Sequence, residues 1–200
     1  MAMTLHRLRE IYGPAMQKAL DKELDYLDPH CGEFIAHSPF LILGTSDGIQ
    51  VDLSPKGDPA GFVKVLGERK LVIPDRPGNG RIDGLMNILQ HPDVSILFLI
   101  PKVNETLRVF GRAEISEDET LRAQTTCEGK VPKTVTIIHV DKAFLHCGKA
   151  PIRSGLWQPE SWPETRPIQS AGNIFRDHIG ASGPDVPQEA VDAALKKKLY

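Results

Sequence analysis

Two strand-like segments joined by an Asp-Gly pair constrain the fold more than any other feature of this sequence. The segments are FLILGTS and IQVDLS, and Asp47-Gly48 lies between them. An Asp-Gly pair accepts the positive φ angles of a tight hairpin turn, so it is a strong local signal for a β-hairpin. In the second segment Ile49, Val51 and Leu53 fall on one face and polar residues on the other. The chain is therefore predicted to enter antiparallel β-structure at about residue 40.

Four further segments have the length and the apolar content of β-strands. They are residues 62–74, 94–101, 106–115 and 133–147. With the hairpin they bring the predicted number of strands to six, all antiparallel. Short strands in an open sheet leave exposed edges, and closure into a barrel removes those edges. The fold class predicted from the residues is therefore mainly β with flanking helices, built on a six-stranded antiparallel barrel.

Helices are predicted on both sides of this barrel. Apolar residues recur at helical spacing near the N-terminus, in a helix that Thr4 caps and Gly13 ends, and in a second helix that ends before Asp28. Two short helices are predicted between residue 173 and the C-terminus. We therefore expect a helical N-terminal segment over residues 1–38, a barrel domain over 39–163 and a helical tail over 164–200.

Composition and charge exclude several classes of protein. The net charge is -2 and basic residues are not clustered, which argues against a nucleic-acid-binding protein. No signal peptide or membrane-spanning stretch is recognised. The chain has three cysteines without CxxC spacing, which favours reduced thiols in the cytoplasm. His139 and His146 have no third ligand at a suitable spacing, so no metal site is predicted.

The segment IPDRPGNGRIDGLMNIL joins the third predicted strand to a helix that we expect to begin at Arg81. Gly78 and Gly80 let main-chain N–H groups converge on an anion, and a helix N-terminus adds partial positive charge. Arg76 and Arg81 bracket the turn, and each guanidinium can give paired hydrogen bonds to a phosphate group. Asn79 offers a further amide donor. This pattern predicts a phosphate-binding turn.

The same residues are also typical of a surface turn with exposed arginines, and the local sequence alone leaves both interpretations open. The turn matches neither the dinucleotide fingerprint nor the P-loop, because GxGxxG, a following Gly-Lys-Ser/Thr and the βαβ alternation are all missing. No GxSxG motif supports a serine hydrolase.

Four segments taken together resemble the pyridoxamine 5′-phosphate oxidase-like flavoproteins, and within them the subgroup labelled FMN-dependent enzymes. They are GIQVDLSPKGDPAGFVKV, LVIPDRPGNGRIDGLMNILQHPDVSILFLIP, ETLRVFGRAEI and AFLHCGKAPIRSGLWQPESW, in the order of the family. The resemblance covers about residues 40–162. It implies a split β-barrel of the FMN-binding type that forms a homodimer and binds FMN at the interface between subunits.

The resemblance also implies which residues contact FMN. The turn after the third strand would hold the phosphate through Arg76, Asn79 and Arg81, with backbone groups of Pro74 and Asp75. The preceding strand would contribute Val51, Asp52, Ser54 and Lys56, and a later strand Thr106 and Arg108. The second subunit would contribute the segment HCGKAPIRSGLW through Lys149, Arg153, Ser154 and Trp157.

One departure from the family limits the functional prediction. The pyridoxamine phosphate oxidases proper carry a C-terminal Arg-x-His-Asp-Arg-like segment that holds the vitamin phosphate, and this chain instead has RSGLWQPESWPETRP and a helical tail. We therefore expect an FMN-dependent oxidoreductase for an unidentified small molecule, with no side chain singled out as catalytic. The alternatives are a flavin-binding or sensor protein without turnover, and the same fold with a deazaflavin or haem.

Overall fold

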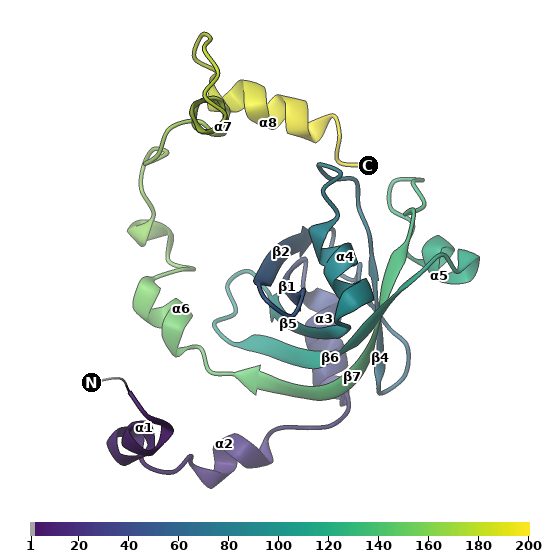
Figure 1. Cartoon of the computed structure of the whole chain (residues 1–200), viewed down its shortest axis with the longest axis vertical. Helices are drawn as coiled ribbons and strands as arrows, with labels where there is room; N and C mark the ends of the chain where they lie inside the picture. The colour runs from purple at the N-terminus through teal and green to yellow at the C-terminus, as the bar shows by residue number, and fades with distance from the viewer. Residues whose placement is uncertain (1–2) are drawn as a thin grey trace.

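The computed structural model describes residues 3–200, and its strands form one antiparallel sheet that curls around an apolar core, with helices on its flanks (Figure 1). The sheet order is β2-β1-β5-β6-β7-β4-β3. The strands are β1 (Phe40–Ser46), β2 (Val51–Gly57), β3 (Lys64–Val65), β4 (Lys70–Pro74), β5 (Asp93–Leu99), β6 (Thr106–Ser116) and β7 (Val135–His146). The prediction of an antiparallel β-fold with flanking helices is confirmed.

The predicted Asp47-Gly48 hairpin joins β1 to β2, with Ser46 opposite Val51. The Asp47 carboxylate accepts hydrogen bonds from the N–H groups of Ile49 and Gln50, at 2.8 and 2.7 Å. Gly48 has a φ of +89°, and an added Cβ there would lie 2.6 Å from Nε2 of His91. Both the conformation and the close imidazole therefore require glycine at this turn.

The prediction of a single strand over residues 62–74 is wrong. The structure has a hairpin there, formed by β3 and β4. Gly67 has a φ of +75° and reverses the chain, and the Leu66 N–H donates to the Lys70 carbonyl at 2.8 Å. The sheet therefore has seven strands instead of the predicted six.

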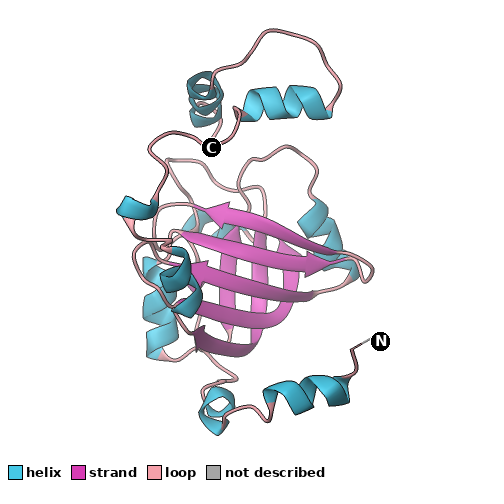
Figure 2. Cartoon of the chain, turned by 90° about the vertical axis from the view of Figure 1, so that its left-hand side faces the viewer, coloured by secondary structure: helices cyan, strands magenta, loops and turns pink. Residues whose placement is uncertain are grey.

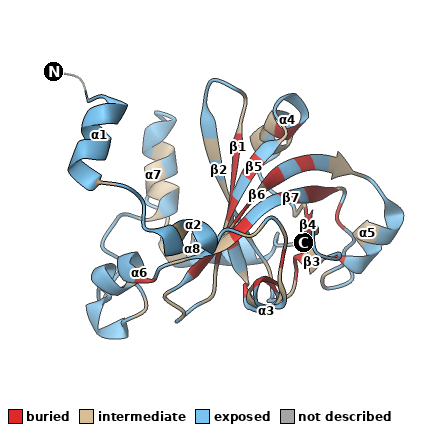
Figure 3. Cartoon of the chain, turned by 90° about the horizontal axis from the view of Figure 1, so that it is seen from below, coloured by how far each residue is buried: buried red, intermediate tan, exposed pale blue. Residues whose placement is uncertain are grey.

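The core lies inside the curled sheet and under two helices, α3 (Pro29–His37) and α4 (Asp83–Gln90) (Figure 3). Cys31 and Ile35 of α3 and Ile88 of α4 reach it. The largest side chains that are fully enclosed include Phe98, Leu41, Leu71, Leu107 and Ile138. These positions come from five different strands, so the core depends on the whole sheet.

The N-terminal helices are α1 (Leu5–Tyr12) and α2 (Gln17–Asp21). Thr4 caps α1 as predicted, its side chain accepting from the Arg7 N–H. The second helix ends earlier than predicted, because Leu24 is extended and pairs with Ala143 through two main-chain hydrogen bonds of 3.0 and 2.8 Å. The chain then reaches Asp28, which caps α3.

The remaining helices are α5 (Glu119–Gln124), α6 (Lys149–Ser154), the 3-10 turn η1 (Pro159–Ser161), α7 (Ala171–His178) and α8 (Gln188–Lys196). The N-terminal helices and the α7–α8 tail project from opposite ends of the barrel (Figure 2). Neither α7 nor α8 contains a buried residue. Within residues 3–200, no helix has the length and apolar character needed to span a bilayer.

Candidate functional site

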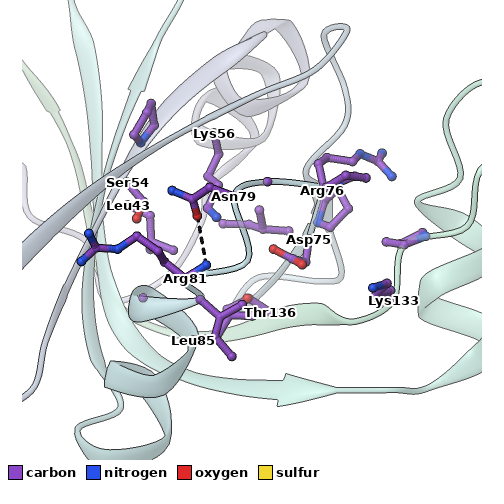
Figure 4. A pocket seen from close by; sticks show the side chains of 18 of the residues that line it. Leu43, Ser54, Lys56, Asp75, Arg76, Asn79, Arg81, Leu85, Lys133 and Thr136 are labelled. Atoms are coloured by element: carbon purple, nitrogen blue, oxygen red, sulfur yellow. Dashed lines mark hydrogen bonds between the residues drawn. The ribbon is translucent and has the colours of Figure 1, made fainter. Parts of the chain in front are cut away.

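A cavity of about 600 Å³ lies where the turn between β4 and α4 meets β2 (Figure 4). The end of β4, the turn and the start of α4 contribute every residue from Ile73 to Leu85, and the segment 130–133 before β7 closes another side. Small-molecule sites occupy roughly 300–1,000 Å³. The cavity is therefore large enough for a cofactor-sized ligand, and the predicted phosphate turn forms its largest wall.

The turn has the backbone geometry of an anion cradle, although its helix begins later than predicted. Asn79 accepts the Arg81 N–H through its side-chain oxygen at 3.0 Å, and Gly80 has a φ of +78°. Ile82 is the N-cap of α4 with φ +53° and ψ +22°, so the helix starts at Asp83 rather than at Arg81. A β-branched residue in this left-handed region is strained, which is typical of a backbone shaped for a ligand.

The two arginines of the turn point to opposite sides of the cavity (Figure 4). Arg81 is 74% exposed and its Nε donates to the Asp83 carboxylate at 2.7 Å. Arg76 is only 17% exposed and its Nε donates to the Asp58 carboxylate at 2.6 Å. The expectation that both guanidinium groups converge on one anion is therefore not met by this arrangement, and Arg81 is the arginine whose side chain is accessible.

Positive charge outweighs negative charge around the cavity, although the whole chain is slightly acidic. Five cationic side chains line it against three carboxylates, while the net charge of the chain is -2. The cations are Lys56, Arg76, Arg81, Lys130 and Lys133, and the carboxylates are Asp52, Asp75 and Asp83. Such a local excess favours an anionic ligand.

Strand β2 turns its polar face toward this cavity. Asp52, Ser54 and Lys56 all line it, as predicted for FMN contacts, and the Ser54 hydroxyl donates to Asp52 at 3.3 Å. Of the alternating apolar positions, Val51 is 79% exposed and lies outside the cavity, whereas Leu53 borders it. The structure therefore brings three of the four predicted β2 residues to the cavity and leaves Val51 outside it.

The other predicted contacts lie elsewhere in this chain. Thr106 is buried in β6 opposite His146, and Arg108 follows on the same strand. The pKa of His146 lies below its ordinary value, first because of burial and then because of the charge on Arg108. Lys149, Arg153 and Ser154 belong to α6. The indole of Trp157 donates to the Val103 carbonyl at 2.9 Å.

Sequence reasoning missed several residues that the fold adds to the site. Lys130 and Lys133 reach the cavity from the loop before β7, and Tyr200 reaches it from the C-terminal tail. Asp58 lies behind Arg76. The basic pair Lys130 and Lys133 is visible in the sequence as KVPK, but nothing local indicates that this loop or Tyr200 meets a turn far away in the chain.

A metal centre finds no support in the described part of the chain. Among residues 3–200, no group of three or more His, Cys, Asp and Glu side chains is arranged to hold a metal ion.

Comparison with solved structures shows the fold. A single-residue variant of HupZ from Group A Streptococcus is 20% identical, with a TM-score of 0.50, and the match covers 60% of this chain and 99% of that one. General stress protein 26 from Bacillus anthracis is 17% identical, with a TM-score of 0.45 and coverages of 58% and 93%. An FMN-binding protein from Syntrophomonas wolfei is 14% identical, with a TM-score of 0.44 and coverages of 72% and 97%.

The predicted split barrel is thereby confirmed, with a seventh short strand. No curated protein matches the sequence. A family model does, and it is described as pyridoxamine 5′-phosphate oxidase. Its match runs over residues 27–147, which contain the whole barrel and the predicted phosphate turn. The chain belongs to the pyridoxamine 5′-phosphate oxidase family.

Proposed function

We propose that this protein binds FMN in the cavity beside the β4–α4 turn and acts as an FMN-dependent oxidoreductase on a small molecule. The observation on which the proposal depends is that the predicted phosphate turn lines a cavity with an excess of cationic side chains. Family membership supports the choice of a flavin over other phosphorylated ligands.

The residues present fit the phosphate end of FMN. Gly80 and Ile82 have positive φ angles, and the N-terminus of α4 has no side-chain cap. Main-chain N–H groups of the turn and helix are therefore suited to an anion. Arg81 can exchange its exposed partner Asp83 for a phosphate oxygen with little loss of stability, because an exposed ion pair contributes only about 0–1 kcal/mol to the free energy of unfolding.

The remainder of the cavity fits a flat, partly apolar ring. Leu43, Leu53, Ile73 and Leu85 contribute apolar surface, and Pro132 and Val131 close the side next to β7. Bound FMN would supply two-electron redox chemistry. The protein would supply orientation, exclusion of water and fixed charges around the ring.

We further propose that the protein is a homodimer. Ile49, just before β2, and Val51 on β2 form an exposed apolar stripe, with exposures of 91% and 79%, and Leu53 (65% exposed) continues it to the edge of the cavity. An apolar stripe of this kind is typical of an interaction surface. Thr106, Arg108, Lys149, Arg153, Ser154 and Trp157 do not line the cavity of their own chain, so their predicted contacts with FMN are proposed to be made to the cavity of a second copy.

FMN titration of the purified protein tests the assignment. We expect Arg81→Ala to weaken binding by about 1.5–3 kcal/mol, the scale of a charged hydrogen bond. Asp83→Asn should strengthen binding, because it frees Arg81 and removes a carboxylate beside the phosphate. Arg112→Ala is the matched control, because Arg112 is an exposed arginine on β6 outside the cavity.

If Arg81→Ala and Arg112→Ala bind FMN equally well, the phosphate assignment is wrong. Oxidation of reduced nicotinamide, or reduction of a dye, by the FMN-loaded protein then separates an enzyme from a flavin-binding protein without turnover. If the protein takes up no FMN at all, both the enzyme and the flavin-binding protein without turnover are ruled out.

A further inference from the structure

The tail that follows the barrel is tied back to it by Tyr200. Figure 1 shows residues 163–200 leaving the barrel near α6 and returning beside the β4–α4 turn. The Tyr200 hydroxyl donates to the Asp58 carboxylate. Within residues 3–200, this is the one hydrogen bond between the tail and the barrel. Tyr200 is therefore held by a local set of contacts rather than by a packed tail.

Asp58 is the centre of these contacts. Its side chain is only 2% exposed, and one oxygen accepts from Arg76 Nε at 2.6 Å while the other accepts from Tyr200. A buried carboxylate is tolerated only when its oxygens have partners. Without Tyr200, one oxygen of Asp58 would therefore need another donor.

Arg76 supplies a flat surface next to this acceptor. Its guanidinium lies over the Tyr200 ring at 5.6 Å from the ring centre, and its Nη2 is fixed by the Thr125 carbonyl at 2.8 Å. The pKa of Tyr200 is raised, first by its hydrogen bond to Asp58 and then by the neighbouring Cys127 thiol, so its hydroxyl remains a proton donor. The site thus combines a buried acceptor with a cationic surface for an aromatic ring.

We propose that Asp58 and Arg76 form a binding site for the aromatic hydroxyl group of a small molecule, and that Tyr200 is the internal occupant which such a molecule replaces. Tyr200 and Arg76 both line the cavity, so the exchange takes place at its wall. Because α7 and α8 bury no residue, release of Tyr200 breaks few contacts other than those to Asp58 and Arg76, and the incoming ring forms these again.

The charges select this chemical class. A cationic ligand is disfavoured by the adjacent guanidinium of Arg76, and an anionic ligand is disfavoured by the carboxylate of Asp58. A neutral hydroxyl donor on a flat ring satisfies both groups. The site goes beyond the proposed function, because its occupation does not require bound FMN.

The probe is 4-methylphenol, which is the tyrosine side chain itself, and the matched control is 4-methylanisole, in which the hydroxyl donor is methylated. Binding is measured by calorimetry on the full chain carrying Tyr200→Ala. We expect 4-methylphenol to bind at least about tenfold more tightly than 4-methylanisole, the scale of a lost hydrogen bond to a charged group. Wild-type protein should bind 4-methylphenol more weakly than the variant, because the tail competes intramolecularly.

Alkylation of Cys127 gives a second measurement that is independent of affinity. The Tyr200 side chain adjoins Cys127, whereas Cys147 is exposed and remote from this contact, so Cys147 is an internal reference. Tyr200→Ala should speed modification of Cys127 by iodoacetamide, and 4-methylphenol should slow it again while 4-methylanisole does not. Equal affinity for the two compounds, no binding of either, or an alkylation rate unaffected by Tyr200→Ala would overturn the proposal. These results are separate from FMN titration, so either proposal can fail alone.

Discussion

At the scale of single residues, Arg76 and Arg81 show how two arginines of one turn acquire different roles. Arg76 is enclosed by Asp58, the Thr125 carbonyl and the Tyr200 ring, whereas Arg81 meets only Asp83 among charged side chains of the described residues. The enclosed guanidinium is part of the folded structure. The exposed one is available to a ligand.

Stability measurements should separate these two roles. Arg76→Ala leaves the buried Asp58 carboxylate without its charged partner, so we expect the free energy of unfolding to fall by about 3 kcal/mol. Arg81→Ala removes an exposed ion pair and should change it by no more than about 0.5 kcal/mol. Urea unfolding at pH 7 measures both. Equal stability of the two variants would contradict the structural role given to Arg76.

At the scale of secondary-structure elements, the β6–β7 pair bends at a bulge between Phe110 and Gly111. An added Cβ at Gly111 would lie 2.1 Å from the His139 carbonyl oxygen, which belongs to the partner strand and cannot move aside freely. The two longest strands can therefore cross this point only if residue 111 has no side chain.

We accordingly expect Gly111→Ala to lower the free energy of unfolding by about 2–3 kcal/mol, the usual range for overpacking. Gly78→Ala is the matched control, because an added Cβ there meets no atom within 4 Å. Its effect should stay within about 0.5 kcal/mol. Thermal and urea unfolding of both variants test this, and a tolerated Gly111→Ala would show that the register shift is not fixed by the glycine.

The N-terminal cap of helix α3 makes a contribution to the free energy of unfolding that depends on pH. Its cap Asp28 accepts the Cys31 N–H at 2.8 Å, and this hydrogen bond is the main reason that the pKa of Asp28 lies below its ordinary value of 3.8. A lowered folded-state pKa contributes stability above the unfolded-state pKa and loses it as the pH falls through the folded-state value.

Asp28→Asn keeps an acceptor at the cap but cannot titrate. At pH 7 the wild type should be more stable than this variant by about 0.5 kcal/mol, because a charged cap interacts better with the helix N-terminus. The difference should shrink below about pH 4 and vanish at lower pH. Urea unfolding across this range checks the sign, and a difference that is constant with pH would contradict it.

The elements also show what the sequence could and could not predict. The β1–β2 hairpin and the Thr4 cap were predicted because Asp47-Gly48 and Thr4 act on neighbouring residues. The β3–β4 hairpin was not, since Gly67 fits a bulge as well as a turn. A turn between a strand and a helix was predicted where β4 passes into α4, although the helix begins at Asp83 rather than Arg81. The partners of Arg76 were not predicted, because Asp58 and Tyr200 reach it only through the tertiary fold.

At the scale of the whole molecule, apolar surface remains uncovered on the outside of the sheet and on the N-terminal helices. Ile49 before β2 and Val51 and Leu53 on it are exposed, and α1 and α2 contain no buried residue (Figure 3). The polar positions of β2 face the cavity on the other side of the same strand. A partner bound to this stripe would therefore lie directly behind the cavity, which would connect the proposed dimer to the proposed flavin site.

Val51→Glu tests this connection, because it places a charge in the middle of the stripe without touching the cavity. Burying that charge should weaken the dimer by at least about 3 kcal/mol, or roughly a hundredfold in dissociation constant. Gln50→Glu adds the same charge one residue earlier and should remain dimeric. Sedimentation velocity gives the oligomeric state, and FMN titration of the same samples should show weaker binding only for Val51→Glu. A monomeric wild type would exclude the proposed dimer. A Val51→Glu dimer of unchanged affinity would show that the second copy binds at another surface.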